Sequence, residues 1–317
     1  MLTVTDLSTR FGAYAVTEGL SFTVEPGSTT CLIGESGCGK TVTLLSLLGL
    51  SRGTVSGSVA LEGRELLGLS PRAWRRVRGR EISMIFQEPQ SALNPVMTVG
   101  RGLCELIAAH RPMGAALLRR EAEGLMAAVG LPGPSTLFDR YPHELSGGMR
   151  QRVLIAGALA HSPRLVLADE PTSALDMTIR AQIIDLFGRL KRERSCSFLI
   201  ATHDLALVRR LADRVLVMYA GELVEQGEAA EVLSTPRHPY TRALLAAARE
   251  EGPLSLLEGE PPSPAAFPTG CRFHPRCPDS LPACALARPA MEGGSDHMWR
   301  CPLKISASAI SCPESKS

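Results

Sequence analysis

Short runs of alternating apolar and polar residues open the chain. Residues 2–4 and 20–24 follow a two-residue period, and Gly12, Gly19, Pro26 and Gly27 interrupt the runs. A two-residue period is typical of strands with one buried face, and glycine and proline favour the tight turns between them. The first part of the chain is therefore predicted to form an antiparallel β portion.

Later runs are apolar almost throughout and predict strands buried inside a larger sheet. They lie at residues 29–33, 82–86, 165–168 and 197–202. Helical patterns follow or separate them, at residues 41–50, 115–130, 153–160 and about 177–193. Residues 91–160 combine helical spacing with glycine and proline connections, which indicates a helical subdomain. The whole pattern predicts an α/β fold.

Composition narrows the class of protein. The chain has 317 residues, 44% of them hydrophobic, and a net charge of +2. This supports a sizeable core, while the charge alone gives no reason to expect nucleic acid. No apolar run approaches the ~20 residues of a bilayer span, and the N-terminus lacks a signal-peptide pattern. We therefore expect a cytosolic protein, in which nine cysteines favour metal or cluster ligation over disulfides.

A phosphate-binding loop stands between the strand at 29–33 and the helix that follows. It fits the pattern G-x-x-x-x-G-K-[ST], and its residues are Gly34, Glu35, Ser36, Gly37, Cys38, Gly39, Lys40 and Thr41. Such a loop turns backbone N–H groups and a helix N-terminus toward an anion. We expect Lys40 to reach the β- and γ-phosphates and the Thr41 hydroxyl to hold Mg²⁺. A chance match is expected in roughly one chain in a hundred, and the flanking strand and helix make it rarer.

Polar residues stand where three further strands end. Gln87 follows the strand at 82–86, Asp169 and Glu170 follow the strand at 165–168, and His203 follows the strand at 197–202. Each alone is a weak signal, but parallel strands deliver their carboxyl ends to one edge of a sheet. We expect Asp169 to coordinate Mg²⁺, Gln87 to contact Mg²⁺ or the catalytic water, and Glu170 to orient or deprotonate the attacking water.

Two weaker candidates complete the site. Ser146, Gly147 and Gly148 precede a helical run, which suits a second anion site and equally an ordinary serine cap. Phe11 suits stacking on an adenine ring, with a half-buried strand aromatic as an equal alternative, and Tyr14 is the second choice for that role.

These motifs, in this order, resemble those of ABC transporter ATPases. The resemblance covers the chain to about residue 303, and residues 84–95 and 238–244 resemble the peptide and nickel importer branch. It implies a P-loop ATPase with a RecA-like core. It also implies two such subunits facing head to tail, so that ATP at Lys40 of one is closed over by Ser146 and Gly148 of the other. His203 would contact the γ-phosphate, and Asp176 would signal across the interface.

The resemblance further implies the partner proteins and the cellular location. These are a second ATPase subunit, with a heterodimer expected, two membrane permease subunits, and indirectly an extracytoplasmic substrate-binding protein; no nucleic acid is expected. The protein would lie at the cytoplasmic face of the inner membrane and power uptake of dipeptides and oligopeptides. Nickel or a metal chelate is the alternative cargo. Two other classes of protein remain as alternatives. One is a soluble ABC ATPase acting on ribosomes or DNA, and the other is a structural Fe–S or zinc subunit with a vestigial nucleotide site.

The C-terminal part has its own composition. We divide the chain into an ATPase domain (1–250), a proline-rich linker (251–270), a cysteine-rich motif (271–303) and a serine-rich tail expected to be disordered (304–317). The motif holds Cys271, Cys277, Cys284 and Cys301, whose spacing does not choose a metal. The resemblance implies a [4Fe–4S] cluster on these four cysteines. Zinc and free thiols stay open as alternatives.

Overall fold

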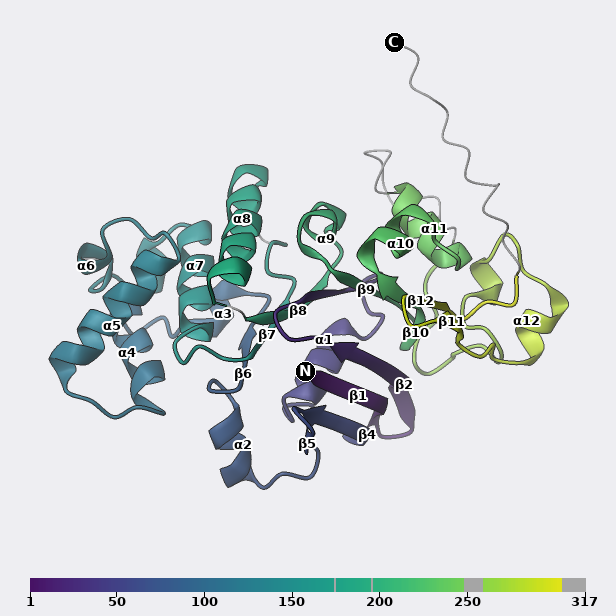
Figure 1. The fold of residues 1–317 in the computed structure, drawn as a ribbon, viewed down its shortest axis with the longest axis horizontal. Coiled ribbons are helices and arrows are strands. Elements are labelled where there is room, and N and C mark those ends of the chain that lie inside the picture. Colours follow the sequence, from purple (N-terminus) through teal and green to yellow (C-terminus); the bar gives the residue numbers. More distant parts are fainter. Residues whose placement is uncertain (174, 195, 248–258, 304–317) are drawn as a thin grey trace, which may run out of the picture.

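Two β-sheets form the centre of the protein, and helices surround them (Figure 1). The computed structural model describes residues 1–173, 175–194, 196–247 and 259–303. A group of helices lies at one end of the molecule and the C-terminal extension, residues 259–303, lies at the other. The α/β class predicted from the hydrophobic pattern is confirmed.

The smaller sheet is antiparallel and is built by the first part of the chain. Its strands, in sheet order, are β2 (Tyr14–Val24), β1 (Leu2–Phe11), β4 (Thr54–Leu61) and β5 (Arg64–Glu65). Leu2, Val4 and Leu7 of β1 are buried, and polar residues between them face outward. The alternation seen in the sequence therefore corresponds to a sheet with one buried face and one face toward solvent.

The larger sheet carries the strand ends that form the site. Its strands, in sheet order, are β11 (Glu292–Gly294), β12 (His297–Trp299), β10 (Glu222–Glu228), β9 (Arg214–Tyr219), β3 (Thr29–Ile33), β8 (Ser197–Thr202), β7 (Leu165–Asp169) and β6 (Ile82–Ile85). From β9 to β6 neighbouring strands are parallel, and β10 and β12 are added antiparallel. The parallel strands therefore end at a common edge.

A run of helical elements, which we call the helical subdomain, follows β6 and precedes β7. Its elements are α3 (Pro89–Ala92), α4 (Val99–Ala108), α5 (Ala115–Ala128), α6 (Pro134–Leu137), the 3₁₀ turn η1 (Pro142–Glu144) and α7 (Gly147–Ala158). The remaining helical elements flank the sheets or belong to the extension. They are α1 (Lys40–Leu47), α2 (Pro71–Val77), α8 (Met177–Arg194), α9 (Leu205–Leu211), α10 (Ala229–Ser234), α11 (Pro239–Ala247), η2 (His274–Arg276) and α12 (Pro282–Leu286).

Helix α1 ends earlier than the predicted residue 50. Gly49 has a φ of 59°, its N–H donates to the carbonyl of Ser46, and the Leu50 N–H donates to the carbonyl of Leu45. This pair of bonds is a Schellman motif, which closes a helix at a left-handed glycine. A Cβ at Gly49 would lie 2.6 Å from the Trp74 ring, so the position also requires glycine for space. Because leucines lie on both sides of Gly49, the sequence pattern predicts a helix that continues past its actual end.

The core lies on both faces of the larger sheet. In β3, Leu32 packs with the buried residues of the antiparallel sheet and α1, while Cys31 and Ile33 pack with those of the helical subdomain, α8 and α9. All three side chains are fully buried. A strand covered on both faces is expected to be apolar throughout, which is why residues 29–33 lack alternation.

The C-terminal extension docks against this body through paired strands, a buried aromatic and ion pairs. Strand β12 pairs with β10, and Phe273 is 1% exposed between the rings of Tyr219 and Tyr240. Arg272 is buried with its Nε 2.6 Å from Glu222 Oε1. These contacts hold in place an element that, on sequence alone, has little core-forming content.

Residues 259–270 contain neither helix nor strand. The rest of the predicted linker, residues 251–258, and the predicted tail at 304–317 lie outside the described residues. Within the described parts of the chain, no helix has both the length and the apolar character that crossing a membrane requires.

Candidate functional site

The phosphate loop connects β3 to α1 and is shaped by its glycines. Gly34 has a φ of 157°, and a Cβ there would lie 2.1 Å from the carbonyl oxygen of Met218. Gly39, with a φ of 109°, precedes Lys40 at the N-terminus of α1 and would clash with Met218 and Thr17 if it carried a Cβ. Only glycine fits both positions, so the loop can lie close against β9.

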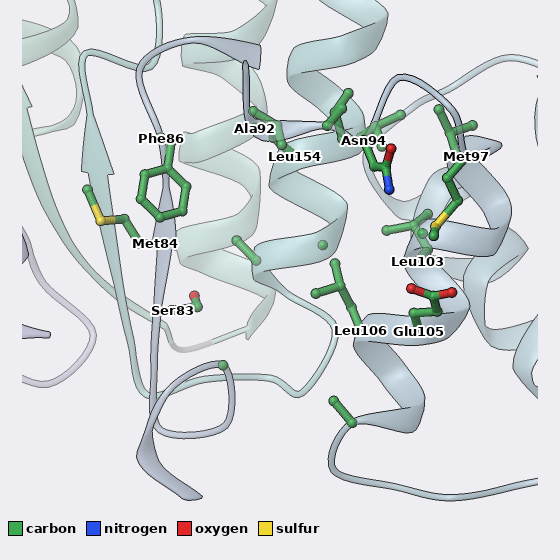
Figure 2. A pocket seen from close by; sticks show the side chains of 18 of the residues that line it. Ser83, Met84, Phe86, Ala92, Asn94, Met97, Leu103, Glu105, Leu106 and Leu154 are labelled. Carbon is green, nitrogen blue, oxygen red and sulfur yellow. The ribbon is translucent and has the colours of Figure 1, made fainter. Parts of the chain in front are cut away.

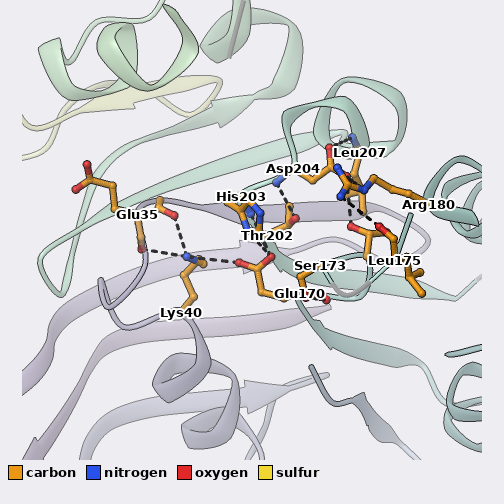
Figure 3. Close-up of polar contacts among 12 residues, drawn as sticks. Glu35, Lys40, Glu170, Ser173, Leu175, Arg180, Thr202, His203, Asp204 and Leu207 are labelled. Carbon is orange, nitrogen blue, oxygen red and sulfur yellow. Dashed lines mark hydrogen bonds and ion pairs between the residues drawn. The ribbon is translucent and has the colours of Figure 1, made fainter. Parts of the chain in front are cut away.

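Lys40 lies across the mouth of the loop. Its Nζ donates to the carbonyl oxygens of Gly34 at 2.8 Å and Glu35 at 3.1 Å, and it lies 3.7 Å from Glu170 Oε1 (Figure 3). The residue is only 7% exposed. A buried ammonium whose partners are mostly neutral carbonyls is well suited to exchange them for phosphate oxygens.

Glu170 and His203 face each other at the ends of β7 and β8. Glu170 Oε2 lies 2.8 Å from His203 Nδ1, and the Glu170 side chain is 10% exposed whereas that of His203 is 63% exposed. The hydrogen bond to Glu170 raises the pKa of His203 above its ordinary value. Glu170 has a φ of 46°, a left-handed conformation that is strained for a non-glycine residue and is often found at functional positions.

The residues proposed to hold Mg²⁺ fit a hard cation. Asp169 is 2% exposed, and its Oδ1 has no hydrogen-bond partner among the residues that the structure describes. Burial raises the pKa of Asp169, and the Thr41 hydroxyl beside it opposes that effect. A buried carboxylate oxygen without a partner is costly unless a cation or water satisfies it. Oxygen donors are what Mg²⁺ takes, so the donor set suits the ion.

Most of the predicted site residues border one pocket of about 590 Å³, although the buried Asp169 is not among the described residues that line it. The structure thus brings together the groups that the sequence predicts for one edge of the sheet, namely Lys40, Thr41, Gln87, Glu170 and His203, with the loop residues Gly34, Glu35, Ser36, Gly37 and Gly39. Cys38 belongs to the same loop but is 3% exposed, and burial raises the pKa of its thiol.

Other predicted residues lie apart from this pocket. Ser146 caps α7 by accepting from the Met149 N–H at 3.3 Å, and neither it, Gly147 nor Gly148 is among the described residues that line the pocket. Asp176 is exposed and accepts from the Ile179 N–H at 2.9 Å in the first turn of α8.

Phe11 and Tyr14 also lie outside the pocket lining. They pair across the turn between β1 and β2, and they are 39% and 52% exposed. Val16, two residues along β2 from Tyr14, does line the pocket. The adenine-stacking role of Phe11 therefore stays a prediction.

Comparison with known proteins identifies the family. A family model described as "ABC transporter" matches residues 17–173, and one described as "Oligopeptide/dipeptide transporter, C-terminal region" matches residues 224–284. The chain is 45% identical to the oligopeptide transport ATP-binding protein OppF of Escherichia coli K12 over 296 residues, which cover 91% of this chain and 87% of that one. It is 42% identical to OppD of the same strain, covering 95% and 92%. The chain belongs to the ABC transporter family.

A solved ABC structure has the same fold. It is a dimeric ATP-binding cassette in a post-hydrolysis state bound to ADP and Pi, 26% identical with a TM-score of 0.65. The alignment covers 72% of this ABC protein and 99% of the solved chain.

The cysteines of the extension do not form a recognisable metal site. In the described residues, no group of three or more His, Cys, Asp or Glu side chains is placed to hold a metal ion. Burial raises the pKa of Cys277 and Cys301 to about 11 and also raises that of Cys271. The predicted [4Fe–4S] cluster and its zinc alternative therefore find no support in this geometry.

The C-terminal half of this ABC protein supplies contacts that sequence reasoning missed. Leu244 and Ala247 of α11 line the nucleotide pocket. The Tyr240 hydroxyl accepts from the Glu35 N–H at 2.8 Å, and Arg276 forms two hydrogen bonds with the Glu35 carboxylate. Tyr240 lies in the stretch 238–244 that resembles peptide importers, which was a usable signal, but Arg276 had none.

Proposed function

We propose that this protein is the ATP-hydrolysing subunit of an importer of dipeptides and oligopeptides. The phosphate loop and Lys40 bind the polyphosphate, and His203 contacts the γ-phosphate. Thr41, Asp169 and Gln87 hold Mg²⁺, which neutralises charge on the phosphates when it is bound. The observation that carries the ATPase part of this proposal is the convergence of Lys40, Thr41, Gln87, Glu170 and His203 on one pocket, and the peptide cargo is supported by the similarity to peptide transport proteins.

Glu170 acts in the proposed reaction as the general base. A water oxygen bonds to the γ-phosphorus as the bond from that phosphorus to the β–γ bridging oxygen breaks, and the water proton passes to a Glu170 oxygen. The products are ADP and Pi. The contact of 2.8 Å with His203 fixes the orientation of the Glu170 carboxylate, which keeps one oxygen directed at Lys40 and the pocket.

A second ATPase subunit completes the site. Ser146, Gly147 and Gly148 lie at the N-terminus of α7 and away from the pocket of their own chain, so an ATP bound by the partner is a natural ligand for them. The solved cassette similar to this chain is dimeric. A heterodimer is favoured because two distinct proteins of one E. coli strain, OppF and OppD, resemble this chain almost equally.

A groove beside the nucleotide pocket suits a membrane permease. It has a volume of about 520 Å³ between β6, α4 and α7 and is lined largely by apolar side chains (Figure 2). Phe86 and Leu106 there are 43% and 50% exposed. Phe86 borders the groove and the next residue, Gln87, borders the nucleotide pocket, so a segment docked in the groove would act on both. We therefore propose that the protein works at the cytoplasmic face of the inner membrane.

The iron–sulfur cluster stays a prediction from the resemblance alone, and no step above depends on it. Its test is iron and acid-labile sulfide analysis of protein purified without oxygen. About four irons per chain would establish it. An iron-free sample containing zinc would favour the alternative ligand.

The function is tested by uptake in cells whose copy of the gene is deleted. We expect uptake of labelled dipeptides and tetrapeptides to be lost and to return with the wild-type gene but not with Lys40→Ala. Loss of ⁶³Ni²⁺ uptake with peptide uptake intact would overturn the peptide assignment. Unchanged uptake of both, with ribosomes or nucleic acid recovered on the tagged protein, would overturn transport itself.

The groove assignment has its own test. Phe86→Glu places a charge in the groove without touching the phosphate loop, so the purified variant should hydrolyse ATP within about twofold of wild type and fail to retain the permease subunits in a detergent pull-down. Retention of the permease by Phe86→Glu would contradict docking at this groove.

A further inference from the structure

Glu35, the second residue of the phosphate loop, is held from three directions. Its carbonyl oxygen accepts from Lys40 Nζ at 3.1 Å, and its N–H donates to the Tyr240 hydroxyl at 2.8 Å. Its carboxylate accepts from Arg276 Nη1 at 2.8 Å and Nη2 at 3.1 Å. Figure 3 shows that the carboxylate points away from Lys40, so the side chain leaves the pocket while the backbone remains in it.

The residue that takes this carboxylate belongs to the C-terminal extension. Arg276 closes the 3₁₀ turn η2, and its N–H donates to the carbonyl of Phe273, which is 1% exposed in the aromatic cluster. Its Nη1 also donates to the Tyr219 hydroxyl at 3.2 Å. The guanidinium is therefore fixed by a buried anchor, by a second hydrogen bond and by its own bidentate geometry.

The pair is enclosed. The side chains of Arg276 and Glu35 are 7% and 10% exposed, so water screens their charges little. Without Arg276, the negative charge of Glu35 would be unpaired at the second residue of a loop whose ligand is a polyanion. Like charges at this separation repel, and the effect is larger where solvent is excluded. The loop therefore needs a cation at this position, and the extension supplies it.

We propose that Arg276 is a positioning residue for the nucleotide: it draws the Glu35 carboxylate out of the pocket and neutralises it, so that the phosphate loop can accept ATP. The C-terminal extension is thereby part of the nucleotide site. This inference rests on the proposed ATP-binding function, and it adds a residue 241 positions away from the loop.

The direction in which ATP affinity changes distinguishes charge neutralisation by Arg276 from simple structural support. Arg276→Ala leaves a negative charge at the loop and should weaken ATP binding about tenfold, the order expected for one unit charge near a polyanion. Glu35→Gln removes the negative charge and leaves a cation, so ATP binding should stay within about threefold or become tighter. The double variant should bind like Glu35→Gln, which would be a rescue of Arg276→Ala.

The experiment measures the Kd of a fluorescent ATP analogue and the KM and kcat for ATP on the full-length protein. Arg276→Ala is expected to raise Kd and KM together and to change kcat less than about threefold, because Glu170 and His203 keep their contacts. Arg288→Ala is the matched control. Arg288 also belongs to the extension, but its guanidinium contacts Glu222 and Glu18, which lie outside the phosphate loop.

Three outcomes would overturn the proposal: an unchanged Kd in Arg276→Ala, equal weakening in both single variants, or no rescue in the double variant. If Arg276→Ala does not fold, Arg276→Lys keeps the charge without the bidentate geometry and should raise Kd less than tenfold. The Kd of Glu35→Gln still shows whether removing the negative charge weakens or strengthens ATP binding. A wild-type protein that binds no ATP would instead refute the proposed function, which keeps the two failures distinct.

Discussion

The two sides of the phosphate loop differ in how their charges are satisfied. On the pocket side, Lys40 lies 3.7 Å from Glu170, and its nearer partners are carbonyl oxygens. On the extension side, Glu35 and Arg276 form an enclosed bidentate pair. The pocket side thus keeps charges available for a ligand, and the extension side has charges already paired.

This difference shows how a glycine-rich loop is prepared for a polyanion. Charges that must exchange partners during turnover need weak contacts, because a strong pair would compete with the ligand. Charges that only shape the loop need strong contacts, because any unpaired carboxylate there would repel the phosphates. Variants on the two sides should therefore fail in different ways, on kcat and on ATP affinity.

The largest effect is expected on the pocket side, for Glu170→Gln. Loss of a general base costs roughly 10²- to 10⁴-fold in rate, while the amide leaves the phosphate loop unchanged. We expect single-turnover ATP hydrolysis to fall by at least about 100-fold with ATP Kd within about threefold, and the variant to accumulate as an ATP-bound closed dimer.

Glu123→Gln is the control for this variant, because Glu123 pairs with Arg119 on the surface of the helical subdomain. Near-normal hydrolysis by Glu170→Gln would show that another group accepts the proton. The pocket side would then lose the role that distinguishes it from the extension side.

The second effect is expected for Phe273→Ala on the extension side. Removing a buried Phe from a packed core costs about 3–5 kcal/mol, and Phe273 is the buried anchor of the turn that ends at Arg276. We expect faster proteolysis within residues 271–303 and a rise in ATP KM similar to that of Arg276→Ala. Leu286→Ala, at a residue of the same extension that is 82% exposed, should change neither.

An extension that stays protected in Phe273→Ala would show that strand pairing and ion pairs fix it without the aromatic cluster. In that case the ATP KM should remain normal, and Arg276 would not depend on the aromatic cluster for its position.

The same two sides also differ in what the sequence could predict. Gln87, Glu170 and His203 each follow a strand that a local apolar run predicts. Because those strands are parallel, the three residues lie at the same edge of the sheet. Arg276 has no such local sign. It reaches Glu35 across 241 residues because β12, three residues long, pairs with β10, and a strand that short has too few positions to show a period. Periodicity predicts elements, and pairings between distant elements require the folded chain.

The third prediction concerns the pH dependence of the pocket side. The Glu170 hydrogen bond raises the pKa of His203, so the charged pair stabilises the fold below the ordinary pKa of 6.5, and this contribution is lost as pH rises through the raised value. We expect NMR titration to place the pKa of His203 above 6.5 in wild type and lower in Glu170→Gln. The signal is assigned with His203→Gln.

A His203 pKa at or below the ordinary value, or one unaffected by Glu170→Gln, would contradict the contact. The free energy involved is small because His203 is largely exposed, so this titration tests the geometry of the pocket side rather than its stability.

The smallest effect is expected for Asp279→Ala, which removes an exposed tie between the extension and α11. Asp279 Oδ2 accepts from Arg242 Nη2 at 2.7 Å, and the side chains are 48% and 31% exposed. Exposed pairs contribute about 0.2–1 kcal/mol, so the urea midpoint should shift slightly and the ATP KM should remain that of wild type. If Asp279→Ala raised the KM as much as Arg276→Ala, the docking of the whole extension, and not the pairing of Glu35, would prepare the loop. A normal KM in Asp279→Ala beside a raised KM in Arg276→Ala would instead locate the effect in the enclosed pair of Glu35 and Arg276.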